Sequence, residues 1–262
     1  MHLVVVLTLH LAGARSVGYV LRIQGDAAGS ALEPFLRSFT FLRDAVIGVG
    51  SNRLLAKIYV EPDAIIAESP GALPVATLQY LYSSRYCQVD QVQQQAWDRF
   101  GRMPRGYAQV QAIHDWVRDT LKFQAGSSCT GTSVLETLRD QQGVCRDFAH
   151  TMITFCRALN YPARFVTGVD YGADVSYGPP DFHAYVEVFI GGAWYLFDPT
   201  GITQVNGLVR IGTGRDAAET SFATIFGPVL TGMPKVEYDA IDDPINGLAL
   251  PGSTQLAVST AD

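Results

Sequence analysis

The sequence predicts an α+β fold, in which helices pack on an antiparallel sheet behind a small β-sandwich-like N-terminal domain. Three patterns predict it. Residues 1–75 alternate β-type apolar runs with turn clusters. Helical spacing then recurs between residues 89 and 159, and a hairpin pattern follows over residues 182–199. We therefore expect a β-rich domain over residues 1–75, an α+β domain over residues 76–243, and a loose tail over residues 244–262.

The N-terminal region shows β-type runs such as "LVVVLTL", "VGYVLRI" and "RLLAKIYV". Its first run is short for a membrane span, carries no basic segment before it, and is interrupted by histidine. These features favour a buried strand over a signal peptide, although a processed segment stays an alternative. We expect a cytoplasmic location and no membrane partner.

The second region begins with helices. Apolar spacing predicts helices over residues 89–100 and 107–123, and Ser133 and Gly143 mark the start and stop of a third. The helix that begins at Cys145 has an apolar stripe formed by Phe148, Met152, Phe155 and Leu159. Asn160 and Pro162 end this helix.

Strands follow. "ARFVTGVDYG" predicts one strand, and "FHAYVEVFIGGAWYLFDPTG" predicts a hairpin around Gly191-Gly192. "KVEYDAI" near Lys235 predicts a late strand. The polar, small residues after Asp243 predict the loose tail.

Composition excludes several functions. The 262 residues carry a net charge of -6 and no basic run, which argues against a nucleic-acid partner. The four cysteines form no CxxC pair, and the five histidines form no HExxH motif. We therefore predict reduced thiols, no metal site and no cofactor.

The hairpin brings two chemically useful side chains together. A two-residue turn at Gly191-Gly192 places Tyr185 opposite Asp198. Because strand side chains alternate, His183 shares that face, and His183 and Asp198 become diagonal neighbours about 7–8 Å apart at the backbone. A carboxylate beside an imidazole fixes its tautomer and stabilises its charged form.

Cys145 is the candidate nucleophile. The positive end of a helix dipole and a nearby imidazolium both favour a thiolate, and Cys145 stands at a predicted helix start. Cys156 lies about three turns further on and is predicted to be core. The simpler alternatives are that Cys145 is an inert buried thiol, that His183 caps a loop, and that Asp198 only forms the turn in "FDPT".

At this point the motifs resemble a known family. "GVCRDFAH", "DFHAYVEVFIGGAWYLFDPT" and "GLVRIGTGRDAAETSFATIFG" resemble the bacterial transglutaminase-like superfamily, whose members are often described as candidate cysteine proteases. "SSRYC" also resembles a family segment. The resemblance implies a papain-like α+β fold with Cys145 as nucleophile, His183 as general base and acid, and Asp198 as orienting carboxylate.

The resemblance also implies a reaction, which is acyl transfer on a peptide or protein substrate through a thioester at Cys145. We expect hydrolysis, with transamidation open, and no calcium dependence, since no acidic cluster resembles a calcium site. The alternatives are an arylamine-type N-acetyltransferase and a non-catalytic interaction module. Asp170, Tyr171 and Tyr86 are further candidates for substrate binding. Oligomeric state is open.

Overall fold

The computed structural model describes residues 2–9, 18–26, 57–178, 181–220, 235–241 and 250–260. Its centre is an antiparallel sheet of six strands in the order β3-β11-β8-β7-β6-β9. In chain order these are β3 (Lys57–Val60), β6 (Ala163–Asp170), β7 (Phe182–Ile190), β8 (Ala193–Phe197), β9 (Leu208–Gly214) and β11 (Ala257–Thr260). The predicted antiparallel sheet is thereby confirmed.

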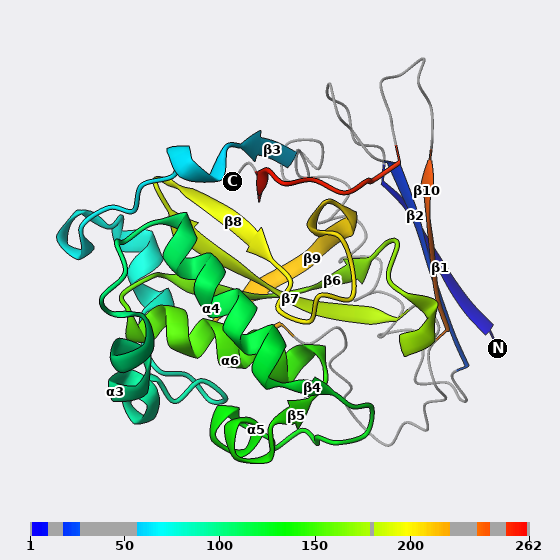
Figure 1. Ribbon diagram of the computed structural model, residues 1–262. Helices are drawn as coiled ribbons and strands as arrows, with labels where there is room; N and C mark the ends of the chain where they lie inside the picture. The colour runs from blue at the N-terminus through cyan, green and yellow to red at the C-terminus, as the bar shows by residue number, and fades with distance from the viewer. Residues whose placement is uncertain are drawn as a thin grey trace.

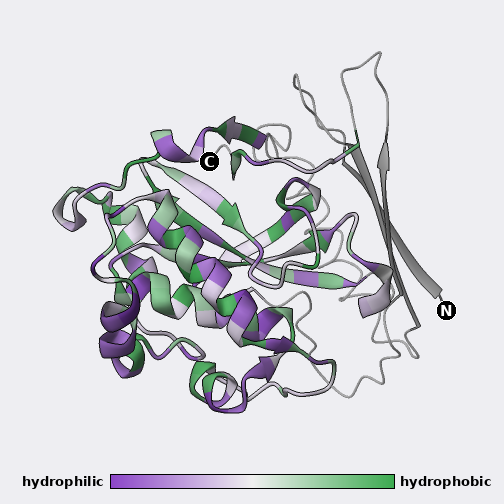
Figure 2. Ribbon diagram, in the orientation of Figure 1, coloured by the Kyte–Doolittle hydropathy of each residue, from purple (hydrophilic) through white to green (hydrophobic). Residues whose placement is uncertain are grey.

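Helices cover one face of this sheet (Figure 1). They are α3 (Val89–Phe100), α4 (Tyr107–Thr120), α5 (Val134–Asp140) and α6 (Cys145–Ala158). Helix α4 ends at Thr120 rather than at residue 123, because Leu121 is extended and Lys122–Phe123 (β4) pairs in parallel with Gln142–Gly143 (β5). Helix α3 presents a hydrophilic surface outward, whereas the strands beneath the helices are rich in hydrophobic residues (Figure 2).

Helix α6 is the centre of the core. Every residue from 147 to 158 is buried, and the predicted stripe of Phe148, Met152, Phe155 and Leu159 is at most 1% exposed. Asn160 follows the helix with a φ of 62°, a left-handed conformation that asparagine tolerates better than most residues. A helix buried this completely holds its first residue, Cys145, in a fixed place against the sheet.

A second, three-stranded antiparallel sheet joins β1 (His2–Leu9), β2 (Gly18–Asp26) and β10 (Lys235–Ile241), with β2 in the middle. The strands predicted from "LVVVLTL", "VGYVLRI" and "KVEYDAI" are present. The β-sandwich-like domain over residues 1–75 stays a prediction, since residues 27–56 lie outside the described ones. Strand β3, although within that range, belongs to the six-stranded sheet.

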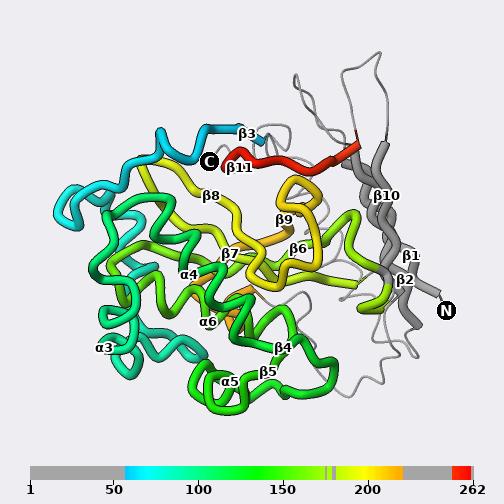
Figure 3. The backbone as a smooth tube through the Cα atoms, viewed as in Figure 1, coloured from blue at the N-terminus to red at the C-terminus, as the bar shows by residue number. Residues whose placement is uncertain are grey.

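The prediction of a loose tail over residues 244–262 is wrong for its last described segment. Ala257–Thr260 forms β11, which pairs with β3 along four residues and with β8 at Ser259 (Figure 3). All four residues of β11 are buried. Burial and ladder hydrogen bonds with distant strands order this short segment, and neither is visible in its local sequence.

Candidate active site

The hairpin of β7 and β8 has the predicted register. Ile190 pairs with Ala193 across a two-residue turn in which Gly191 and Gly192 have φ values of 60° and 86°. Positive φ at both positions is the requirement of the turn that matches strand twist, and glycine meets it without steric cost. Val186 pairs with Phe197, so the next residue, Asp198, comes to the His183 end of β7.

The register brings the predicted pair together. Nε2 of His183 lies 3.2 Å from Oδ1 of Asp198, and both side chains are almost fully buried, at 4% and 1% exposed. The diagonal relation that alternation predicted from the sequence is therefore present as an ion-pair contact.

Cys145 is the first residue of α6. Oδ2 of Asp147 accepts a hydrogen bond from the backbone N–H of Val144 at 2.9 Å, which satisfies a donor that the helix start would leave unpaired. Gly143 makes this cap possible, because a Cβ there would lie 2.6 Å from Cβ of Asp147. The Cys145 side chain is half-buried, and it is one of the groups that act on the charge of the His183 imidazole. Cys156, in contrast, is fully buried in the core, as predicted.

Charge fixes the protonation of this site. Burial would lower the pKa of His183, but the Asp198 carboxylate and the Cys145 thiol together outweigh it and raise the pKa well above the ordinary range. Burial would likewise raise the pKa of Asp198, but the His183 charge and hydrogen bonds from Thr200 lower it instead. An imidazolium facing a carboxylate is therefore the stable form of the pair at neutral pH.

Asp198 is itself held by neighbours that the sequence did not single out. Its Oδ1 accepts hydrogen bonds from the backbone N–H of Thr200 at 3.1 Å and from the Thr200 hydroxyl at 2.7 Å. Nε2 of His114, from α4, lies 2.8 Å from the backbone oxygen of Asp198. The turn chemistry of "FDPT" signalled the Thr200 contact, whereas the helical spacing around His114 carried no signal for a contact 84 residues away.

The structure places Asp170 beside the triad candidates. Asp170 ends β6, and its Oδ2 lies 3.2 Å from Nδ1 of His183. Its neighbour Tyr171 is anchored through its backbone, which donates to Gly207 and accepts from Thr203. A role of Asp170 or Tyr171 in substrate binding stays a prediction.

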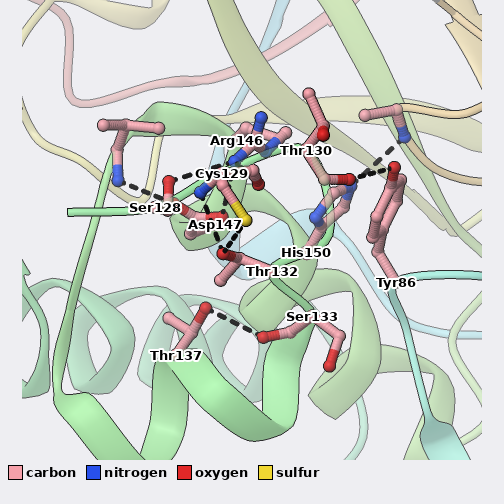
Figure 4. Close-up of polar contacts among 12 residues, drawn as sticks. Tyr86, Ser128, Cys129, Thr130, Thr132, Ser133, Thr137, Arg146, Asp147 and His150 are labelled. Atoms are coloured by element: carbon pink, nitrogen blue, oxygen red, sulfur yellow. Dashed lines mark hydrogen bonds and ion pairs between the residues drawn. The ribbon is translucent and has the colours of Figure 1, made fainter. Parts of the chain in front are cut away.

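The Tyr86 side chain is buried rather than exposed to solvent. Its ring stacks on His150 with centroids 4.9 Å apart, and its hydroxyl donates to the backbone oxygen of Thr130 at 2.7 Å. Arg146, next to the nucleophile candidate, donates to Ser128 Oγ at 3.0 Å and to the Cys129 backbone at 2.8 Å (Figure 4). Tyr86 and Arg146 thus support the same loop, residues 128–132, and substrate binding by Tyr86 stays a prediction.

Among the described residues there is no group of three histidine, cysteine or acidic side chains arranged to hold a metal ion. None of the helices in the described ranges has the length and apolarity that a bilayer crossing needs.

Comparison with known proteins shows which family this chain is similar to. The model of the transglutaminase-like superfamily matches residues 94–199, which include all three triad candidates. A crystal structure of a candidate cysteine protease from Cytophaga hutchinsonii is 37% identical with a TM-score of 0.68, covering 78% of this chain and 69% of that one. An uncharacterized protein of Mycobacterium leprae is 30% identical over 117 residues, 43% of this chain and 42% of the relative. The matched region thus spans less than half of that curated relative.

Proposed function

Because this chain belongs to the transglutaminase-like superfamily, we propose that it is a thiol-dependent enzyme that transfers an acyl group through a thioester on Cys145. One observation carries the proposal: the half-buried Cys145 thiol at the start of α6 acts on the charge of the His183 imidazole, and Nε2 of that imidazole lies 3.2 Å from the buried Asp198 carboxylate. Nucleophile, base and orienting group in contact are the arrangement that covalent acyl transfer requires.

The proposed reaction has two stages. The Cys145 sulfur attacks a peptide or amide carbonyl, and a tetrahedral oxyanion forms. The backbone N–H of Cys145, at the positive end of α6, is one donor available to that oxyanion. When the C–N bond breaks, the His183 imidazolium gives its proton to the departing amine. Neutral His183 then takes a proton from the second nucleophile, which attacks the thioester and releases Cys145.

We propose that water is the second nucleophile, so that the overall reaction is hydrolysis of a peptide or amide bond. The description of the Cytophaga hutchinsonii relative as a candidate cysteine protease supports hydrolysis. An amine in place of water would give transamidation by the same steps, since only the resolving nucleophile differs.

The first test is the pH dependence of Cys145 alkylation by iodoacetamide, with the label located by mass spectrometry. We expect labelling below the free-thiol pKa of about 8.5, and loss of that labelling in His183→Ala. Cys129 is exposed and serves as the reference thiol in each sample. Slow labelling of Cys145 at the same rate in wild type and in His183→Ala would refute the proposal and favour a non-catalytic module.

The second test identifies the acceptor. A peptide mixture is incubated with the enzyme, with and without an added primary amine, and products are identified by mass. Hydrolysis yields free carboxylates in both samples, whereas transamidation yields amine adducts only in the second. Cys145→Ala should abolish both products while its melting temperature stays close to that of the wild type; product formation by this variant would exclude Cys145 as nucleophile.

A further inference from the structure

His183 has a carboxylate on each side of its ring. Nε2 lies 3.2 Å from Asp198, and Nδ1 lies 3.2 Å from Oδ2 of Asp170. The Asp170 side chain is only 11% exposed. A Cys-His-Asp triad needs one of these carboxylates, so the second requires an explanation of its own.

The sheet produces this arrangement. Strand β7 lies between β8 and β6, so the first residues of β7 are flanked by the ends of both neighbours. His183 pairs with Gly168 on β6, and Asp170, two residues beyond Gly168, points to the same side of the sheet. Asp170 reaches the ring from β6, where strand pairing with Leu208 of β9 fixes it, and Asp198 reaches the ring from just after β8, where Thr200 holds it.

The second carboxylate and the nucleophile candidate act on the same ring. Nε2 lies against Asp198 and Nδ1 lies against Asp170, while Cys145 acts on the charge of the same imidazole. A negative charge at this place stabilises the imidazolium, and it also opposes a second negative charge on the sulfur.

We infer that Asp170 is a positioning residue that sets the pH range over which Cys145 and His183 form their thiolate–imidazolium pair. This inference rests on the proposed use of Cys145 as the nucleophile. With Asp170 ionised, thiolate formation and loss of the imidazolium proton both require higher pH. Removing this charge lowers the pH of both events, so the whole range moves in one direction.

The groups that act on this ring come from every element described around it. Asp170 belongs to β6, Asp198 follows β8, and Cys145 begins α6. His114 of α4 contacts the backbone of Asp198. A change at Asp170 that acted only by loosening the fold would disturb all of these contacts and would not shift two titrations in the same direction.

The test uses Asp170→Asn, which keeps the shape of the side chain and removes its charge. Iodoacetamide labelling of Cys145 gives the first titration, and the NMR resonance of the His183 ring gives the second. An opposite charge at this range moves a pKa by about 1 to 3, so the His183 curve should move to lower pH by about that amount, and the Cys145 curve should move in the same direction. Asp170→Glu should stay near the wild type.

Controls separate the possible failures. Asp174 is exposed in the β6–β7 loop, and Asp174→Asn removes an equal charge without touching the ring, so it should move neither curve. If Asp170→Asn leaves both curves in place, the inference is wrong and the proposed function stands. If the labelling of Cys145 is the same in wild type and in His183→Ala, the proposed function fails. The NMR titration of His183 then still tests the effect of Asp170.

A wild-type measurement covers the case in which Asp170→Asn does not fold. Nitrogen-15 correlation spectra report directly whether each ring nitrogen of His183 carries a proton. The inference requires protons on both nitrogens at pH 7. An unprotonated Nδ1 at that pH would overturn it.

Discussion

His150 should make the protein lose stability as the pH falls. It lies on α6 one turn past Cys145, is 1% exposed, and accepts a hydrogen bond at Nε2 from the backbone N–H of Ala217. Burial lowers its pKa from 6.5 to about 3, and the nearby Asp216 carboxylate only partly opposes this effect. The folded state therefore holds His150 neutral at pH values where the unfolded chain is protonated.

The sign and the size of this stability change follow from the difference between the folded and unfolded pKa of His150. Stability from a neutral buried histidine is complete above the unfolded pKa of 6.5 and declines as the pH falls toward about 3. Between pH 7 and pH 5 the unfolded chain gains most of one proton, and the loss is about 2 kcal/mol, at 1.36 kcal/mol per pKa unit. The loss ceases to grow below pH 3, where the folded protein also binds the proton.

His183 acts in the opposite direction over the same range. Its folded pKa is raised, so its contribution is complete below the unfolded pKa of 6.5 and is lost as the pH rises through the folded pKa. The pH dependence of the wild type alone therefore mixes two effects. The comparison of wild type with His150→Gln isolates His150, because both proteins keep His183.

The assay is urea unfolding at constant ionic strength at pH 5, 6 and 7. Wild type should lose about 2 kcal/mol more than His150→Gln between pH 7 and pH 5. Parallel curves would show that His150 is protonated as readily in the folded state as in the unfolded chain, and would refute the account of its burial.

Two further predictions concern the triad and the hairpin. Asp198→Asn should slow acylation of Cys145 by about 10⁴-fold, as removal of the orienting carboxylate does in other triads, with little change in melting temperature; a rate within tenfold of wild type would leave Asp198 no orienting role. Gly191→Ala should destabilise the protein more than Gly192→Ala in urea unfolding. Both residues have positive φ, which costs about 1–2 kcal/mol for alanine, but only at Gly191 would the new Cβ meet the backbone oxygen of Ile66, at 3.0 Å. Equal losses would mean that this contact relaxes.

Local signals account for what the sequence predicted correctly. The N-terminal end of α5 follows from Ser133, whereas Gly143, predicted to stop this helix, lies in β5 because α5 already ends at Asp140. The β7–β8 register follows from the two glycines of a tight turn. That register was sufficient to predict the approach of His183 to Asp198. The position of Cys145 at a helix start made it the candidate nucleophile, and the family motifs pointed to the same residue.

Long-range pairing accounts for what the sequence left out. Eleven residues, 171–181, separate β6 from β7, so alternation could not fix which residue of β6 lies beside His183. Asp170 was therefore a candidate for substrate contact and not for contact with the imidazole. Strand β11 pairs with β3, which lies about two hundred residues earlier in the chain. The short segment of β11 has no periodicity from which a strand could be predicted.

The position and the protonation of the His183 imidazole depend on separate parts of the sheet. The turn at Gly191-Gly192 sets the register of β7 and β8, but it lies at the far end of β7 from His183. The carboxylates that act on the ring stand at the other end, on β6 and after β8. Substitutions at the turn should therefore lower stability while leaving both titrations of the Cys145–His183 pair unchanged, whereas Asp170→Asn should move both titrations. A turn variant that shifted the titrations would mean that the strand pairing between these two ends is too weak to hold the ring in place.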